Sequence, residues 1–353
     1  MVNSSSQVKN IGEKGLIKII SEIIGGLGSE PLTGEDDAVA IPFNKLNSSI
    51  LVINTDMLVS TTDVPPQMTL FEAGRKAVVM CASDVLVKGA IPKWGVVSLG
   101  FPNSLVLDGD SGFKGLIKGI KDGFDHYKIK YLGGDLNESM EIIVSCTIFG
   151  ENEHGKVIPR NGAKVGDIII STGEFGKTGC GFALLLDKKK VSSISSRIKE
   201  NFISSVLKPE TSQGYADILL QNGWVHASAD SSDGIYRTLI QICESSGITA
   251  ELVWNNIPIA EGVSEFAEDT GIKIENLIFQ AGEEFSHIYV IPSEKFREAK
   301  DFFNKKGKEF YKIGRVIKGD PKIILRDRHH NNSTTELEME GFEHFKKKNR
   351  FWS

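Results

Sequence analysis

The chain contains the segment WVHASADSSDG at residues 224–234. The apolar run from Trp224 to Ala229 predicts a strand, and the apolar spacing from Ile235 to Ser246 predicts a helix. The turn between them holds two carboxylates, two hydroxyls and a glycine. A helix N-cap needs only one Ser or Asp, whereas a turn of this composition also suits a hydrated cation with phosphate oxygens. Both interpretations stay open on this segment alone.

Six aspartates are hard to explain structurally, and most lie close to short apolar runs that are predicted to be buried strands. One is in GEDDA at residues 34–38, one ends ILVINTD at 50–56, and one ends YLGGD at 131–135. Ligands of open α/β sheets bind beyond the carboxyl ends of the strands. Carboxylates gathered there repel one another by roughly 4 kcal/mol per close pair at an effective dielectric near ~20, so they need cations between them. The pattern predicts a magnesium–phosphate site containing Asp37, Asp56, Asp84, Asp135, Asp230 and Asp233.

Length and composition are those of a soluble globular protein with two domains. The chain has 353 residues, 40% hydrophobic and 25% charged, and this length exceeds one typical core. A polar stretch with Gly and Pro at residues 151–164 predicts the boundary, which gives domains at 1–150 and 151–353. The net charge of −5 argues against a protein that binds nucleic acid irrespective of sequence.

The thiols and the N-terminal residues favour a cytoplasmic protein. Cys81, Cys146, Cys180 and Cys243 are widely spaced, which fits a reducing compartment better than a disulfide scaffold or a zinc ribbon. The first residues lack the basic region and apolar core of a signal peptide. The apolar stretch at 16–27 is too short to span a bilayer, so no membrane association is expected.

The run STGEFGKT at residues 171–178 follows an apparent strand and ends like a phosphate-binding P-loop. The P-loop pattern requires Gly at its first position, and this chain has Ser171 there. The run is therefore interpreted as a tight turn between a strand and a helix.

Periodicity and turn residues place the other elements. Residues 128–132 and 140–149 are expected to form a pair of strands, and the prolines at 65 and 66 predict an extended or turned segment at 60–68. Further helices are predicted at 13–24, 71–88 and 113–126, and further strands at 38–41, 49–53, 94–99, 167–171, 250–253 and 287–291.

Taken in order, these motifs resemble the thiamine-monophosphate kinase family, within the superfamily that includes aminoimidazole ribonucleotide synthetase and selenophosphate synthetase. The resemblance extends from about Gly12 to about Phe345. It rests on GEDDA at 34–38, NTDMLV at 54–59, the SD pair at 83–84 within residues 76–89, GGD at 133–135, RNGAKVGD at 160–167, DSSDG at 230–234, AGEE at 281–284 and GFEHF at 341–345.

The resemblance implies a two-domain fold like that of aminoimidazole ribonucleotide synthetase. Its N-terminal α/β domain pairs strands with a second subunit, and its α+β C-terminal domain closes over the nucleotide. The implied magnesium ligands are Asp37, Asn54, Thr55, Asp56, Asp84, Asp135 and Asp230, with Asp233 on a further ion; the Asn54 position usually holds Ser or Thr. The implied ATP contacts are Gly134, Asp135, Arg160 and Ser232, and the implied thiamine contacts are Glu283 and Phe342. Catalysis is expected to depend on Asp56, Asp135 and Arg160.

Two departures fall on the acceptor side. Bacterial members carry a substrate-contacting His where this chain has Asp63, and the stretch STTDVPP at 60–66 resembles the archaeal branch. AGEEF at 281–285 replaces the usual Gly-Gly-Glu-Asp-Tyr. Asp63 is therefore a candidate for the substrate contact of the missing His.

The expected activity is ATP- and Mg²⁺-dependent phosphorylation of thiamine monophosphate to thiamine diphosphate by direct in-line transfer, in a homodimer. One alternative is another ATP-dependent kinase or synthetase of the superfamily with a different small phosphorylated substrate. A selenophosphate synthetase should carry a reactive thiol in its N-terminal arm, and the hydrogenase-maturation relative should end in Cys; neither is found here. The other alternative is a catalytically idle nucleotide-binding homologue.

Overall fold

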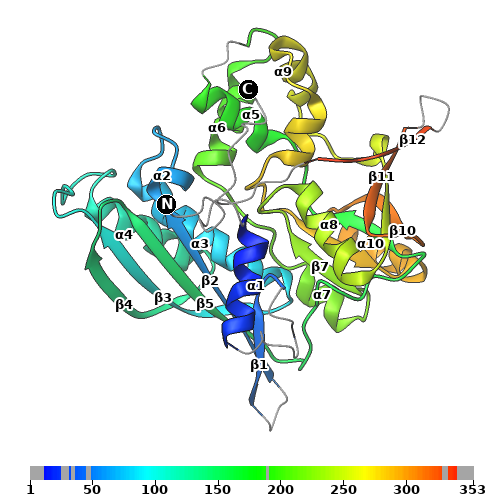
Figure 1. Ribbon diagram of the computed structural model, residues 1–353, viewed down its shortest axis with the longest axis horizontal. Coiled ribbons are helices and arrows are strands. Elements are labelled where there is room, and N and C mark those ends of the chain that lie inside the picture. Colours follow the sequence, from blue (N-terminus) through cyan, green and yellow to red (C-terminus); the bar gives the residue numbers. More distant parts are fainter. Residues whose placement is uncertain are drawn as a thin grey trace, which may run out of the picture.

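A computed structural model of the chain describes residues 12–24, 32, 36–44, 49–187, 191–327 and 333–339. Its strands form two sheets, one built from residues 39–152 and one from residues 168–336 (Figure 1). Among the helices of this described part, none has the length and apolar character needed to cross a membrane.

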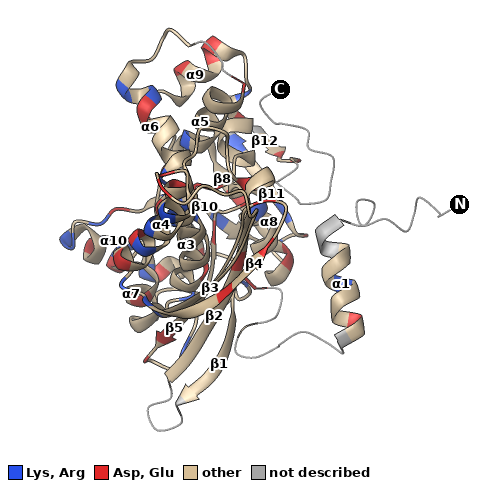
Figure 2. Cartoon of the chain, turned by 90° about the vertical axis from the view of Figure 1, so that its left-hand side faces the viewer, with Lys and Arg blue, Asp and Glu red and all other residues tan. Residues whose placement is uncertain are grey.

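The first sheet has five strands in the order β1-β2-β5-β3-β4. β3 and β4 run parallel, and the other neighbours are antiparallel. The strands are β1 (Val39–Asn44), β2 (Ser49–Val59), β3 (Ile91–Phe101), β4 (Lys130–Glu138) and β5 (Ile143–Asn152). Helices α3 (Leu70–Val87) and α4 (Phe113–His126) cover one face, α2 (Ser60–Asp63) follows β2, and α1 (Gly12–Ile24) lies on the side away from α3 and α4 (Figure 2).

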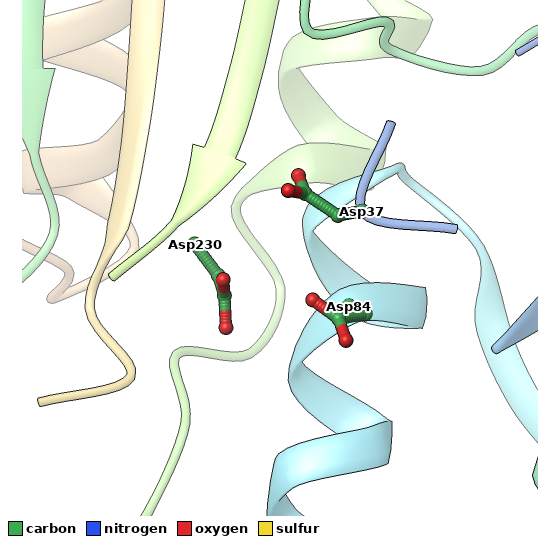
Figure 3. Close-up of side chains that lie close together, drawn as sticks. All are labelled: Asp37, Asp84 and Asp230. Atoms are coloured by element: carbon green, nitrogen blue, oxygen red, sulfur yellow. The ribbon is translucent and has the colours of Figure 1, made fainter. Parts of the chain in front are cut away.

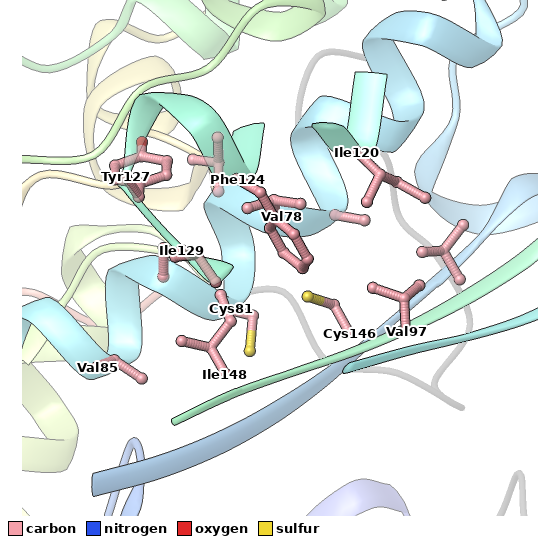
Figure 4. Close-up of a cluster of buried hydrophobic side chains, with 14 of the residues drawn as sticks. Val78, Cys81, Val85, Val97, Ile120, Phe124, Tyr127, Ile129, Cys146 and Ile148 are labelled. Atoms are coloured by element: carbon pink, nitrogen blue, oxygen red, sulfur yellow. The ribbon is translucent and has the colours of Figure 1, made fainter. Parts of the chain in front are cut away.

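Side-chain alternation explains why α3 and α4 cover only one face. In β5 every second residue is buried and the residues between are half exposed, as expected for a strand with one face on a core. The core under α3 and α4 is filled by aliphatic and aromatic side chains and two buried thiols (Figure 4): Val78, Cys81, Val85, Val97, Ile120, Phe124, Cys146 and Ile148.

Helix α3 begins at a capping box. The Thr69 hydroxyl accepts from the Glu72 backbone N–H, and the Glu72 carboxylate accepts from the Thr69 N–H. These two bonds satisfy donors that a helix start leaves unpaired. They fix the position of a helix that is buried along most of its length and that carries several residues of the site described below.

The second sheet has seven strands in the order β12-β11-β8-β10-β6-β9-β7, with only β8 and β11 parallel among its pairs of described strands. The strands are β6 (Ile168–Ser171), β7 (Ala227–Asp230), β8 (Thr249–Val253), β9 (His287–Ile291), β10 (Tyr311–Ile317), β11 (Lys322–Asp327) and β12 (Ser333–Glu336). The helices are α5 (Lys177–Leu186), α6 (Ser196–Leu207), α7 (Ala216–Gln221), α8 (Ile235–Ser246), α9 (Val263–Thr270) and α10 (Phe296–Lys305).

The middle of this sheet is covered on both faces. In β9, Ile288 and Val290 pack into a core with α8, whereas Tyr289 and Ile291 pack into another core with α7 and α10. A strand with cores on both sides is apolar throughout, which explains the run HIYVI and its complete burial. Helices α5, α6 and α9 enclose a separate apolar cluster beside the sheet.

Most predicted elements are present, and several differ in extent. The helices expected at 113–126 and 235–246 and the strand at 287–291 have the predicted bounds, and a helix is present at each of the other predicted positions. β2 continues to Val59, and β7 begins only at Ala227. The pairing expected between residues 128–132 and 140–149 is wrong: β4 pairs with β3, because β5 lies between β2 and β3. The run at 171–178 is the expected strand-to-helix turn between β6 and α5.

Gly119 allows α3 and α4 to approach closely. A Cβ at this position would lie 1.8 Å from the Phe71 carbonyl oxygen. Gly119→Ala should therefore push the helices apart and lower the free energy of unfolding by about 1–3 kcal/mol. Chemical denaturation measures this loss, and the exposed neighbour Lys118→Ala is the matched control. Equal stability of both variants and the wild type would contradict the close packing.

Candidate functional site

Three of the predicted carboxylates meet between the two sheets. Asp37 precedes β1, Asp84 lies on α3, and Asp230 ends β7. One carboxylate oxygen from each residue lies within 4.8 Å of those of the other two, and the three side chains surround a common space (Figure 3). The two parts of the chain therefore contribute jointly to one acidic site.

Asn54 and Asp56 join this cluster from β2. The Asn54 amide nitrogen donates to Asp56 Oδ2 at 2.9 Å and to Asp84 Oδ2 at 2.6 Å. Asn54, which was expected to be a metal ligand, therefore acts in this structure as a donor that bridges two carboxylates. This contact brings Asp56 next to Asp84.

The carboxyl groups of the cluster differ in pKa, and three of them have raised values. Burial, followed by the charges of Asp230 and Asp56, raises the pKa of Asp84 well above its ordinary value. Burial, with the charge of Asp37, raises the pKa of Asp230 to about 7. Burial also raises the pKa of Asp56. These carboxyl groups hold protons at a pH where an exposed aspartate is ionised, as expected for acidic groups that lack a compensating cation.

The pKa of Asp37 is lowered, in contrast to those of the other carboxyl groups. Burial alone would raise its pKa, but the charges of Arg160 and Lys88 outweigh burial and lower the pKa to about 2. Arg160 Nη2 contacts Asp37 Oδ1, and Lys88 Nζ lies 2.6 Å from Asp37 Oδ2. The predicted ATP contact Arg160 therefore lies at the cluster, and Lys88 is a site residue that the sequence analysis missed.

Thr55 and Asp135 lie on the other face of the first sheet. Side chains alternate along a strand, so Thr55 points away from the face that Asn54 and Asp56 share, and its hydroxyl bonds Thr147 at 2.9 Å. Asp135 is exposed and pairs with Ser98, a residue of the uncovered face. The sheet thus separates two of the predicted ligands from the rest within one copy of the chain.

The glycine before Asp135 has a structural requirement of its own. A Cβ on Gly134 would lie 1.7 Å from the Val97 carbonyl oxygen in the neighbouring strand. The close approach that Gly134 allows is therefore to β3, within the same sheet.

The turn after β7 holds Ser232 and Asp233 close to the cluster. The Ser232 hydroxyl donates to Asp230 Oδ1 at 3.1 Å, and its carbonyl accepts from the Glu283 N–H at 2.6 Å. Asp233 is half buried in the same turn. This turn therefore connects the carboxylates to the segment that carries Glu283.

Glu283 and Asp63, both predicted to contact the acceptor, meet at a buried lysine. Lys76 Nζ lies 2.6 Å from Glu283 Oε1 and 2.7 Å from the Asp63 carbonyl oxygen. Glu283 has a left-handed backbone with φ 64°, which is uncommon for a residue other than glycine. Its second oxygen, Oε2, is buried and has no hydrogen-bond partner among the described residues. The third predicted acceptor contact, Phe342, lies outside the described residues.

Neither lysine was predicted as a site residue, because both fall in a segment that has the pattern of an ordinary helix. Lys76 lies within α3 and Lys88 caps its C-terminus, and both side chains are fully buried. A signal was available: the helix is apolar on most of its positions, and lysine is almost never fully buried unless it is paired.

The N-terminus of α5 is already occupied by an acidic side chain. Glu284 Oε1 accepts from the Gly176 N–H at 2.8 Å and from the Thr178 N–H at 3.3 Å. These are the groups that would bind phosphate if residues 171–178 formed a P-loop. The internal carboxylate takes that role, which supports the interpretation of this run as a turn.

A buried chain of polar side chains holds Asp230 in place. Ser83 Oγ donates to Asp230 Oδ2 at 2.7 Å, and Thr211 Oγ1 lies 3.0 Å from Ser83 Oγ and 2.9 Å from His287 Nε2. His287 Nδ1 lies 2.9 Å from the Tyr289 hydroxyl. Burial lowers the pKa of His287 to about 3, so this ring is neutral and takes part through hydrogen bonds.

The fold and the acidic cluster define a class of protein. The family description "AIR synthase related protein, N-terminal domain" matches residues 34–152, and "AIR synthase related protein, C-terminal domain" matches residues 164–326. Both parts of the chain therefore have the fold of aminoimidazole ribonucleotide synthetase relatives. The fold class inferred from the sequence is confirmed.

Similar proteins of known name show which family within this class the chain belongs to. A thiamine-monophosphate kinase of Nitrosopumilus maritimus is 33% identical and covers 96% of this chain and 100% of its own length. One of Pyrococcus horikoshii is 33% identical over 86% of this chain and 89% of its own length. The solved structure of AaThiL complexed with AMPPCP and TMP has a TM-score of 0.79 at 24% identity, covering 97% and 100% of the two chains. The chain belongs to the thiamine-monophosphate kinase family, as the order of its motifs indicated.

The raised pKa values predict that ion binding depends on pH. The folded pKa of Asp230, about 7, exceeds the ordinary value of 3.8, so without metal the folded state loses stability as pH rises between those values. A divalent ion binds the ionised form and must displace this proton. Apparent Mg²⁺ affinity should therefore fall by up to about tenfold per pH unit below about pH 7.

Thermal unfolding with and without Mg²⁺ measures this effect. Mg²⁺ should raise the midpoint more at about pH 8 than at about pH 5.5, because protons compete less at the higher pH. Asp230→Asn should remove most of the difference. A stabilisation by Mg²⁺ that is equal at both pH values in the wild type would contradict the protonated state of the cluster.

Proposed function

We propose that this chain transfers the γ-phosphoryl group of ATP to thiamine monophosphate and releases thiamine diphosphate and ADP. One observation carries the proposal: a chain of the thiamine-monophosphate kinase family brings Asp37, Asp84 and Asp230 together from three separate segments. Relatives that cover nearly the whole chain bear the name of this activity.

The donor set fits magnesium. The acidic side chains that meet in the cluster are all aspartates, and carboxylate oxygens are ligands that suit Mg²⁺. The residues that would hold the ions are Asp37, Asp56, Asp84 and Asp230, with Asp233 close by and with Thr55 and Asp135 on the opposite face of the sheet. Bound Mg²⁺ would neutralise the charge that builds up on the transferring phosphoryl oxygens.

The reaction needs positioning and charge neutralisation more than a protein base. A phosphate oxygen of the acceptor forms a bond to the γ-phosphorus, the bond from that phosphorus to the β–γ bridging oxygen breaks, and ADP leaves. The attacking phosphate, with a second pKa near ~6, is already largely ionised at neutral pH. Arg160 supplies a fixed positive charge at the cluster, and Asp56, Asp135, Gly134 and Ser232 are proposed to position the ions and the nucleotide.

The acceptor end is proposed to lie at Asp63 and Glu283. The buried, unbonded oxygen Glu283 Oε2 offers an acceptor or a negative charge to the cationic thiazolium ring. Lys76 holds the other carboxylate oxygen and thereby fixes the direction of the side chain. Phe342 keeps its predicted role as an aromatic contact to the thiamine moiety.

A homodimer is proposed from the uncovered face of the first sheet. Large apolar side chains are exposed on this face, among them Val39, Ile41, Phe43 and Met57. Exposed apolar patches of this kind mark interaction sites, and the predicted ligands Thr55 and Asp135 lie on the same face. A second copy that covers this face would bury the apolar side chains and come close to these two polar residues.

Two further predictions from the sequence are retained. The chain is proposed to divide into domains near residues 151–164, where β5 ends at Asn152 and the second sheet has not yet begun. A cytoplasmic location is proposed because Cys81, Cys146, Cys180 and Cys243 are all free thiols.

ADP release tests the activity and its acceptor together. ADP should form from Mg-ATP when thiamine monophosphate is present and not when it is absent. Asp56→Asn and Asp135→Asn should each reduce this rate by roughly 100-fold or more while the fold is retained, because each removes a charge that positions cations. The exposed carboxylate of Asp110, changed to Asn, is the matched control.

The other outcomes separate the competing functions. ADP release with a different small phosphomonoester, and none with thiamine monophosphate, would indicate another kinase or synthetase of the superfamily. Mg-ATP binding, seen as thermal stabilisation without ADP release, would indicate an idle homologue. Near-normal activity of both aspartate variants would contradict the assigned roles.

The dimer proposal predicts the effect of a charge on the uncovered face. Met57→Asp or Ile41→Asp should shift the chain from dimer to monomer, because a carboxylate would be buried between apolar surfaces. Sedimentation velocity measures the shift, and Val165→Asp, at an exposed apolar residue of the second half, is the matched control. A wild-type chain that is monomeric at micromolar concentration would contradict the dimer.

A further inference from the structure

The C-cap of α3 places a fully buried ammonium group at the edge of the acidic cluster. Lys88 Nζ lies 2.6 Å from Asp36 Oδ1, 2.6 Å from Asp37 Oδ2 and 2.8 Å from the Ser228 carbonyl oxygen. The Ser228 carbonyl accepts one of the three N–H donors of the ammonium, and the two carboxylate oxygens form ion pairs with it. The group is therefore held by oxygen ligands from two separate segments of the chain.

This ammonium divides the cluster into two halves. In the first half, Asp36 and Asp37 are compensated by side chains, since Lys88 contacts both and Arg160 contacts Asp37. In the second half, the recorded contacts of Asp84 and Asp230 are with neutral groups, the Asn54 amide and the hydroxyls of Ser83 and Ser232. Among the described residues, side-chain cations thus contact the carboxylates of the first half and not those of the second. The charge of Lys88 also favours ionisation of Asp84, but burial and the neighbouring carboxylates outweigh it.

The pKa values agree with this division. The pKa of Asp37 is lowered to about 2, whereas that of Asp230 is raised to about 7 and that of Asp84 is raised well above its ordinary value. Burial alone would lower the pKa of Lys88, but Asp37 and Asp36 outweigh burial and raise it. The lysine is therefore charged throughout the neutral range.

We propose that the Lys88 ammonium is a resident cation of this site, which fills at Asp36 and Asp37 a position that a divalent ion would otherwise take. Exchangeable divalent ions then gather at Asp84 and Asp230, where no side-chain cation contacts the carboxylates among the described residues, and Asp37 lies between these ions and Lys88. A covalently attached cation cannot dissociate, and its bond to Ser228 on β7 holds the Asp36–Asp37 segment against the second sheet before any ion binds.

This inference rests on the proposed magnesium site, and counting bound Mn²⁺ tests the two separately. Equilibrium dialysis or electron paramagnetic resonance of the full chain without nucleotide gives the number of ions bound per chain. Lys88→Gln should bind one more Mn²⁺ than the wild type, because it leaves the two carboxylates without their cation. Lys88→Arg, which keeps the charge, should bind the wild-type number. Adding Asp36→Asn to Lys88→Gln should abolish the extra ion.

A second measurement does not require any Lys88 variant to fold. In the otherwise wild-type chain, Asp36→Asn should leave the number of bound Mn²⁺ ions unchanged, whereas Asp84→Asn should lower it. An unchanged number in Lys88→Gln, or the loss of an ion in Asp36→Asn, would overturn the resident cation while leaving the magnesium site in place. A wild-type chain that binds no Mn²⁺ would overturn the magnesium site itself.

Discussion

Repulsion between buried carboxylates is the constraint around which this structure is organised. Asp37, Asp84 and Asp230 approach within a few ångströms although they come from three distant segments of the chain. Each close pair of ionised groups would repel by roughly 4 kcal/mol at an effective dielectric near ~20. The chain reduces this repulsion on one side with Lys88 and Arg160. On the other side it supplies hydrogen-bond donors and leaves room for protons or metal ions.

Helix α3 connects this constraint to both sheets. Its apolar residues pack beneath the first sheet, and its polar residues face the second half of the chain. Lys76 and Ser83 are seven residues apart, so they lie on one stripe of the helix. Lys76 orients Glu283 at the proposed acceptor end, and Ser83 orients Asp230 at the acidic end. One helix thereby fixes the spacing between the two ends of the site.

The sequence was sufficient for those features that depend on short segments. The aspartates that follow apolar runs, the helices and most strands are local patterns, and Asp37, Asp84 and Asp230 lie close together in the structure. The separation of Thr55 from its neighbours also follows from the two-residue period of a strand. The order of strands in a sheet does not follow from short segments. From the sequence, β4 could pair with β5 or with β3. Which pair forms depends on the crossover through α4 and on packing between distant residues. The buried lysines were likewise hidden, since their partners Asp36 and Glu283 are far away in the chain.

The contacts of α3 also affect how the molecule unfolds. Arg75 donates to the Pro209 carbonyl, and Lys76, Ser83 and Lys88 each bond a residue of the second half. If either half unfolded alone, the other half would lose these contacts and expose the surface that they now bury. States in which only one half is folded are therefore higher in free energy, relative to the folded state, than they would be without these contacts. We therefore expect the unfolding of the two sheets, which have separate cores, to be coupled through α3.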